Sequence, residues 1–255
     1  MKEVNPLKKK PNRLMLHQHD IKCFIDDRDR FYKRFFTTYK EPDHEYYQVG
    51  RAVDYAIKEH YMNGDETLYT NNRDFNVLSD TNQAIVLAMV GGYIEKYKNE
   101  YFHNFQVANY KIPFRNFLIY LSPDWTALDF DNDFWILELK TGLMDQIALN
   151  FQTMMYAWAK YRWDFKPPKG VIKRILRKPT IKQTKKETEA EFHKRLTMDY
   201  VDRPDFYFIT KYELTSKDLI KNFEKYLTEV CKEIEEGMKT QSRHKFYMQT
   251  DKSWA

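Results

Sequence analysis

The spacing of apolar residues changes period along the chain, and this change restricts the fold more than any other feature. Up to about residue 100, apolar residues recur every three or four positions, as in helices with one buried face. Residues 106–140 are instead rich in β-branched and aromatic side chains, with turn sequences at Ser122-Pro123 and Asp131-Asn132-Asp133. Helical spacing returns after Gly142. This order predicts an α/β or α+β fold in which helices flank a central mixed β-sheet.

The expected elements follow from this periodicity and from residues that suit helix ends. Helices are expected at 21–36, 50–64, 80–100, 143–163 and 216–238, with Ser79 or Asp80 and Ser216 as N-caps. Three strands are expected within 106–140, and further strands at 170–178 and 206–214. The polar segment at about 180–203 is predicted to be a helical hairpin inserted between these last two strands.

Length and composition favour one folded domain. The chain has 255 residues, of which 42% are hydrophobic, and its 7 Gly and 9 Pro are too few for a disordered chain. The start of the chain is basic and polar, so we predict an N-terminal arm over residues 1–20 and a single domain over residues 21–255.

Two further features disfavour whole classes of protein. The longest apolar run, residues 84–94, is shorter than the roughly 18 residues that span a bilayer, and the first residues lack the apolar core of a signal peptide, so no membrane association is expected. Cys23 and Cys231 are the only cysteines, too few for a four-thiolate site, so no iron–sulphur cluster is expected. This cysteine usage fits a reducing cytoplasm.

Two carboxylates and a lysine are predicted to converge on one hairpin. If Asp131-Asn132-Asp133 forms the turn, residues whose numbers sum to about 264 lie opposite one another, so Asp124 faces Lys140 and Thr126 faces Glu138. Because side chains alternate along a strand, Asp124, Glu138 and Lys140 share one face. Grouped carboxylate oxygens suit Mg²⁺ or Mn²⁺, which would offset their repulsion.

These residues resemble the signature of the PD-(D/E)XK nuclease superfamily, in its RecB-like and phage-exonuclease branch. Pro123-Asp124 and Glu138-Leu139-Lys140 look like its catalytic motif, and Gln152 with Tyr156 resembles the Gln-x-x-x-Tyr motif of that branch. Gly50 to Asp54 is similar to a Gly-x-x-x-His element, with Asp54 in place of the usual His. The resemblance covers about residues 50–214 and implies a restriction-endonuclease-like core.

The resemblance also implies a mechanism. Asp124 and Glu138, with the backbone carbonyl of Leu139, would hold Mg²⁺ or Mn²⁺, and Lys140 would orient or deprotonate the attacking water. Gln152 and Tyr156, four residues apart on a helix, would contact the site or the DNA backbone. Asp54 is either a third metal ligand or a charge that only satisfies a helix end or a solvated face.

Positive charge is concentrated after the predicted catalytic motif. Residues 160–186 contain eleven Lys and Arg and one acid, Asp164, a net +10, whereas the whole chain has a net +5 and the remainder therefore −5. Such a run favours DNA binding, although it could also be a solvated surface. The predicted DNA-binding residues are Arg162, Lys166, Lys169, Lys173, Arg174, Arg177 and Lys178.

The expected function is a Mg²⁺-dependent deoxyribonuclease, with an exonuclease favoured over a structure- or site-specific endonuclease. The resemblance places it in phage or mobile-element recombination, replication or DNA degradation, where a single-strand annealing protein or another recombination protein could be a partner. A DNA-binding module without turnover is the alternative from another class. Asp129 is a rival to Asp124 as the first acidic residue, although its position in the strand points it to the opposite face.

Overall fold

In a computed structural model, residues 13–39, 45–64, 72–142 and 149–240 are described. The predicted arm therefore lies mostly outside the described residues, as does the start of the helix expected from 143. The architecture is α+β with mixed sheets flanked by helices, as predicted. Within the described ranges, no helix combines the length and the apolar character needed to cross a membrane.

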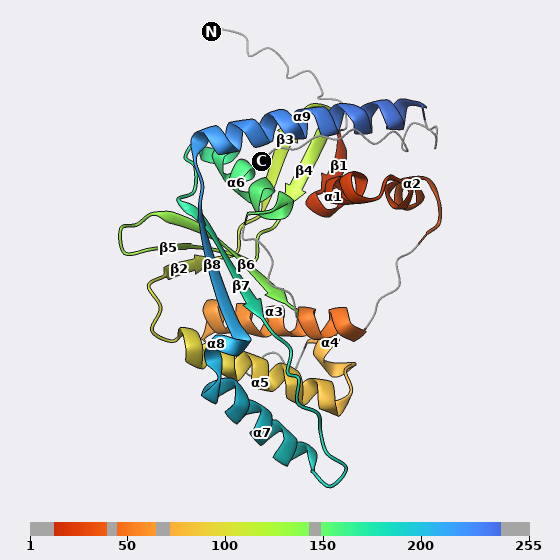
Figure 1. Cartoon of the computed structure of the whole chain (residues 1–255). Coiled ribbons are helices and arrows are strands. Elements are labelled where there is room, and N and C mark those ends of the chain that lie inside the picture. Colours follow the sequence, from red (N-terminus) through yellow and green to blue (C-terminus); the bar gives the residue numbers. More distant parts are fainter. Residues whose placement is uncertain (1–12, 40–44, 65–71, 143–148, 241–255) are drawn as a thin grey trace, which may run out of the picture.

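The larger sheet has five strands in the order β2-β5-β6-β7-β8. Its only parallel neighbours among these strands are β6 and β7, so the sheet is mixed. The two central strands are the most buried, because helices cover both faces of the sheet (Figure 1). The bounds are β2 His103–Gln106, β5 Trp125–Leu128, β6 Phe134–Thr141, β7 Gly170–Leu176 and β8 Phe208–Leu214.

A second, three-stranded sheet corrects two sequence predictions. It has the order β1-β4-β3, with β1 Leu14–His17, β3 Tyr110–Phe114 and β4 Phe117–Leu121. The predicted arm of residues 1–20 therefore ends before Leu14, because β1 pairs with β4 in parallel. The region expected to hold three strands also holds a fourth, because its first part folds into the hairpin of β3 and β4, in which Arg115 turns the chain with a φ of 51°.

The helices form two groups that sandwich the larger sheet (Figure 1). The helices α1, α6 and α9 pack with the smaller sheet on one face, and α3, α4, α5 and α7 pack on the other. Each group encloses its own apolar core. The bounds are α1 Gln18–Asp26, α2 Arg28–Phe36, α3 Glu45–Asn63, α4 Arg73–Asn76, α5 Asp80–Tyr97, α6 Phe151–Asp164, α7 Glu189–Asp202, α8 Pro204–Tyr207 and α9 Lys217–Thr240.

Two helical predictions are wrong in detail for local reasons. The helix expected over 21–36 is broken at Asp27, whose extended backbone ends α1 and whose carboxylate caps α2 by accepting from the Arg30 N–H at 2.9 Å. The segment at 180–203 contains one helix, α7, rather than a hairpin of two. A capping box between Thr188 and Glu191 starts α7, which then packs on α5 as part of the core.

Candidate metal centre

The hairpin of β5 and β6 brings Asp124 beside Glu138. The strands pair Trp125 with Leu137 and Leu128 with Phe134, so opposite residues sum to 262 and the predicted register is wrong by two residues. The turn causes this difference, because the Asp129 N–H donates to the Asp133 carbonyl at 3.1 Å and centres the loop on Asp131. A shift of two residues keeps every side chain on its predicted face.

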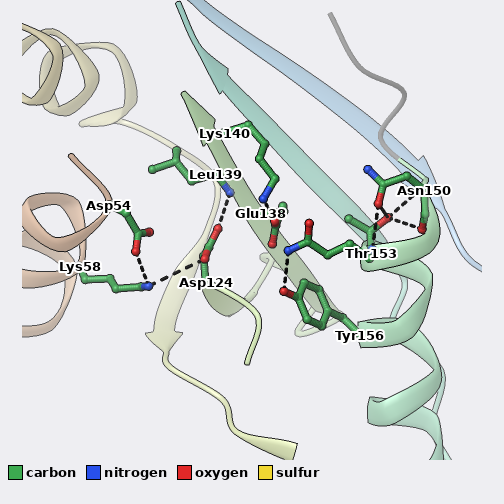
Figure 2. Close-up of polar contacts among 10 residues, drawn as sticks. Asp54, Lys58, Asp124, Glu138, Leu139, Lys140, Asn150, Thr153 and Tyr156 are labelled. Carbon is green, nitrogen blue, oxygen red and sulfur yellow. Dashed lines mark hydrogen bonds and ion pairs between the residues drawn. The ribbon is translucent and has the colours of Figure 1, made fainter. Parts of the chain in front are cut away.

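The carboxylate of Asp124 is anchored to the main chain of β6. Its Oδ2 accepts a hydrogen bond from the Leu139 N–H at 2.7 Å, and its Oδ1 lies 3.8 Å from the Lys58 ammonium (Figure 2). The main chain at Leu139 is thus part of the site. Metal binding by the Leu139 carbonyl stays a prediction.

Glu138 and Lys140 form an ion pair at the same place. The side chain of Glu138 is 1% exposed, and the Lys140 ammonium lies against its Oε1. Its other oxygen, Oε2, is buried and has no hydrogen-bond partner in the described part of the chain. A buried carboxylate oxygen without a partner is costly, so Oε2 is available to a further cation.

Helix α3 carries the third carboxylate of the site, that of Asp54. Asp54 accepts from the Lys58 ammonium at 2.6 Å through Oδ2, while its buried Oδ1 has no hydrogen-bond partner in the described part of the chain. The helix approaches β6 closely because Gly50 has no side chain: a Cβ there would lie 2.8 Å from the Thr141 Oγ1. Of the two readings left open by the sequence, this geometry favours Asp54 as part of the site.

Burial and mutual repulsion set the charge states in this cluster. Burial, followed by the charges of Glu138 and Asp54, raises the pKa of Asp124. Burial likewise raises the pKa of Glu138, although Lys140 opposes the shift. Burial alone would lower the pKa values of Lys58 and Lys140, but the neighbouring carboxylates outweigh it and raise both. The cluster therefore holds three carboxyl groups and, among the described residues, the two ammonium groups of Lys58 and Lys140 that pair with them.

The predicted pair on α6 also lies at this site. The Gln152 side-chain amide donates to the Tyr156 hydroxyl at 2.8 Å, and Figure 2 places Tyr156 beside Glu138. Burial, and then the charge of Glu138, raises the pKa of Tyr156. The N-cap Asn150 fixes the start of α6 by accepting from the Thr153 N–H at 3.1 Å. The structure therefore brings together all five predicted catalytic residues.

A cavity of about 490 Å³ opens beside the cluster. It runs between α3 and the carboxyl end of β6. Its lining includes the carboxylates of Asp54 and Asp124. The lining residues are Tyr47, Gly50, Arg51, Asp54, Asp124, Leu139, Lys140 and Thr141.

The donor set fits a hard divalent cation. Asp54, Asp124 and Glu138 offer only oxygen ligands, the type that Mg²⁺ and Mn²⁺ prefer. Asp54 Oδ1 and Glu138 Oε2 are buried without hydrogen-bond partners from the described residues. Such orphaned acceptors are the expected sign of a site built for a cation.

The rival acid Asp129 has another role. With Asp131 and Asp133 it forms a carboxylate cluster within reach of one ion, but the Lys169 ammonium already lies 2.9 Å from Asp129 and 2.8 Å from Asp133. Asp129 also accepts from the Trp135 indole at 2.9 Å. These contacts close the hairpin turn and lower the pKa of Asp129 despite its desolvation. Because Lys169 already neutralises these carboxylates, a cation would bind more weakly here than beside Glu138.

Two predicted DNA-binding residues are buried, which corrects their assignment. Lys173 is 0% and Arg174 2% exposed, because β7 lies between β6 and β8 with helices on both faces. Lys173 pairs with Glu138 across the sheet, and burial and the charge of Lys140 lower its pKa to about 8. Arg174 donates to Tyr61 at 3.0 Å, and forms an ion pair with Glu100.

The remaining basic residues lie at two opposite edges of the sheet. The Lys169 N–H donates to the Phe134 carbonyl at 2.8 Å, at the amino end of β6, so Lys166 and Lys169 are remote from the cluster. Arg177 and Lys178 directly follow β7, whose last residue Leu176 pairs with Thr141 beside the cavity. Arg162, on the last turn of α6, faces Glu224 at 3.7 Å. The predicted DNA-binding residues therefore do not form one continuous basic surface beside the cluster.

Sequence reasoning missed three residues of the site. Lys58 bridges Asp54 and Asp124, and Tyr47 and Arg51 line the cavity. The four-residue spacing of Asp54 and Lys58 on one helix was a usable signal, because such pairs lie on one helix face. Arg51 and Tyr47 precede Asp54 by about one and two turns of the same helix.

Comparisons with known proteins give no family for this chain. No protein-family model matches it, and no curated protein matches it. Among solved structures, a crystal structure described as SSO0001 is 13% identical, with alignment over 72% of this chain and 84% of that chain and a TM-score of 0.26. A likeness this weak has no bearing on fold or function.

Proposed function

We propose that this protein is a Mg²⁺-dependent deoxyribonuclease of the PD-(D/E)XK type, with a restriction-endonuclease-like core. The observation that supports it most is the meeting of Asp54, Asp124, Glu138 and Lys140 in one cluster beside the cavity. In that cluster Asp54 Oδ1 and Glu138 Oε2 are buried without partners among the described residues. Three acids from different elements converge there: Asp54 of α3, Asp124 directly before β5 and Glu138 within β6. A merely structural role would not leave those oxygens unpaired.

The residues have distinct roles in this proposal. Asp54, Asp124 and Glu138 hold the cation, with the Leu139 carbonyl as a further ligand. A bound divalent ion lowers the pKa of a water ligand and offsets the charge that grows on the phosphate. The neighbouring carboxylates raise the pKa of Lys140, so its ammonium is protonated at neutral pH and binds a phosphate oxygen or orients the water. Gln152 and Tyr156 position the substrate beside Glu138.

The biological setting rests on the sequence resemblance. That resemblance favours an exonuclease acting in phage or mobile-element recombination, replication or DNA degradation, in the cytoplasm and beside a single-strand annealing or other recombination protein. A structure- or site-specific endonuclease would use the same cluster. A DNA-binding module without turnover would not need Lys140 placed against Glu138.

The test is cleavage of end-labelled linear and closed circular duplex DNA, with Mg²⁺ or with EDTA. We expect Mg²⁺-dependent loss of linear DNA, no loss with Glu138→Gln or Lys140→Met, and normal loss with Asp131→Asn, a carboxylate of the hairpin loop. Loss of the circle as well would identify an endonuclease. Tight DNA binding without cleavage under any divalent ion would contradict the nuclease and favour the binding module.

A further inference from the structure

Lys58 occupies the space between two of the carboxylates that the cation would join. Its ammonium lies 2.6 Å from Asp54 Oδ2 and 3.8 Å from Asp124 Oδ1 (Figure 2). An ammonium so placed supplies positive charge that these two acids share. Lys140 serves Glu138 in the same way, so each lysine neutralises a different part of the cluster.

We propose that Lys58 is a tethered competitor for the divalent cation, which displaces its ammonium from Asp54 and Asp124 on binding. This inference rests on the proposed function and concerns how the same site is regulated. A divalent ion bound by Asp54 Oδ1 and Asp124 Oδ1 would lie close to the Lys58 ammonium, which contacts Asp54 Oδ2 and lies 3.8 Å from Asp124 Oδ1. The two positive charges would repel each other at such short range. Metal affinity is therefore set by what it costs to release Lys58.

The structure gives the released lysine a place to go. The Lys58 side chain is 28% exposed, so its long aliphatic stem can turn toward solvent without a change in α3. Its ammonium also lies 5.7 Å from the centre of the Trp125 ring, an aromatic face that still attracts a cation after the carboxylates are lost. Displacement needs only side-chain rotation.

Occupation by Lys58 would also protect the metal-free protein. Without it, the partly buried carboxylates of Asp54 and Asp124 would repel each other and Glu138, with Lys140 as the remaining ammonium of the cluster. The lysine thus stabilises the empty cluster, and its release is coupled to loading. With Lys58 in place, two ammonium groups face three carboxylates, and a bound divalent cation would supply the positive charge that Lys58 gives up.

The first test measures Mn²⁺ affinity by calorimetry in the full chain, in Lys58→Met and in a matched control, Lys22→Met. Lys22 forms the same kind of pair, with Asp26 one helical turn away at 2.5 Å, but far from the cluster in the helix α1. Lys58→Met is expected to bind Mn²⁺ about tenfold more tightly or better, since the competitor is gone, and Lys22→Met to bind as the wild type does.

The second test needs no substitution and separates displacement from a general effect of charge. Lysines of the wild-type protein are labelled with an amine-reactive reagent, and the rate at each site is read by mass spectrometry. Saturating Mg²⁺ is expected to raise the rate at Lys58 several-fold and to leave Lys22 unchanged. An unchanged or slower rate at Lys58 would overturn the inference.

The outcomes distinguish this inference from the proposed function. Equal Mn²⁺ affinity in wild type and Lys58→Met would overturn the competitor while leaving the metal centre intact. Absence of Mn²⁺ binding in every protein would overturn both.

Discussion

The side chain of Asp124 is held in an unfavourable setting by the Leu139 N–H. That hydrogen bond, 2.7 Å long, fixes the carboxylate next to Glu138, and burial and the two neighbouring acids raise its pKa. The folded protein therefore binds the proton of Asp124 more tightly than the unfolded chain does. Above the ordinary carboxyl pKa of about 3.9, ionisation of Asp124 costs folding free energy, and the cost grows until the pH passes the raised pKa.

Asp124→Asn should consequently stabilise the metal-free protein at pH 7, by on the order of 1 kcal/mol. The amide oxygen can still accept from the Leu139 N–H, while the charge is removed. Thermal unfolding in EDTA should show a higher Tm for the variant at pH 7, and this gain should disappear below about pH 3, where Asp124 is protonated in both the folded and the unfolded wild type.

The same variant should lose the stabilisation that Mg²⁺ gives the wild type, because a carboxamide is a poor replacement for a carboxylate ligand. A variant that is less stable than wild type in EDTA at pH 7, or that still gains Tm with Mg²⁺, would contradict the assignment of Asp124. Glu235→Gln offers a contrast, since Arg115 and the Asn116 N–H outweigh burial and lower the pKa of that carboxyl.

At the scale of elements, α3 is fixed to the sheet at two points along its length. Gly50 lets its first half approach Thr141, and Tyr61 in its last turns accepts from Arg174 of β7 at 3.0 Å. Asp54, Lys58 and Tyr61 follow one another at helical spacing, so they lie on the face between these points. The Arg174 network also includes Tyr93 of α5 and Glu100. It positions the helix that carries Asp54.

Arg174→Met should lower the free energy of unfolding by about 3 kcal/mol or more, because it leaves Glu100 and two tyrosine hydroxyls without their buried partner. Urea unfolding followed by circular dichroism measures this. Lys166→Met, an exposed basic residue, is the control and should change stability by less than about 0.5 kcal/mol. An equally small effect of Arg174→Met would show that the network does not hold α3.

Local pattern predicted the hairpin and the face of each residue on it, but not the register. The three acidic and amide residues 131–133 suggested a turn centred on Asn132, whereas the Asp129 side chain and backbone centre it on Asp131. The observed register differs from the predicted one by two residues, an even number, so Asp124, Glu138 and Lys140 lie on the predicted face. An odd error would have moved Asp124 to the other side of the sheet.

The burial of Lys173 and Arg174 could not be predicted from local pattern. Charged side chains are usually exposed, so the pattern predicts a surface position for both residues. They are buried because β8, more than thirty residues later in the chain, pairs with the other edge of β7. Likewise, the sequence around β1 does not predict a strand, because its partner β4 lies about a hundred residues away. Such pairings depend on long-range contacts that periodicity does not record.

At the scale of the whole molecule, the two ends of the parallel strands β6 and β7 have different surroundings. The carboxyl ends of both strands lie beside the cavity, where Arg177 and Lys178 follow β7. The amino ends lie at the 129–133 loop, where Lys169 is occupied by acidic side chains. DNA that reaches the proposed metal centre would thus meet only part of the basic run.

Lys178→Glu should weaken DNA binding and reduce the slope of log affinity against log salt by about 1, as expected for the loss of one phosphate contact. Lys166→Glu makes the same charge change at the remote edge and should leave the slope nearly unchanged. Fluorescence anisotropy with labelled duplex DNA between low and moderate salt gives both values. Equal losses in the two variants would favour a general charge effect over a track beside the cavity.

The central claim is that Asp54, Asp124 and Glu138 together hold a divalent cation. The most direct measurement is anomalous diffraction from a crystal of the protein grown with Mn²⁺, recorded at the manganese edge. We predict an anomalous peak within coordination distance of oxygen atoms from all three carboxylates, with Lys58 turned away from Asp54. A peak only at Asp129, Asp131 and Asp133, or none among the three carboxylates at saturating Mn²⁺, would contradict the account.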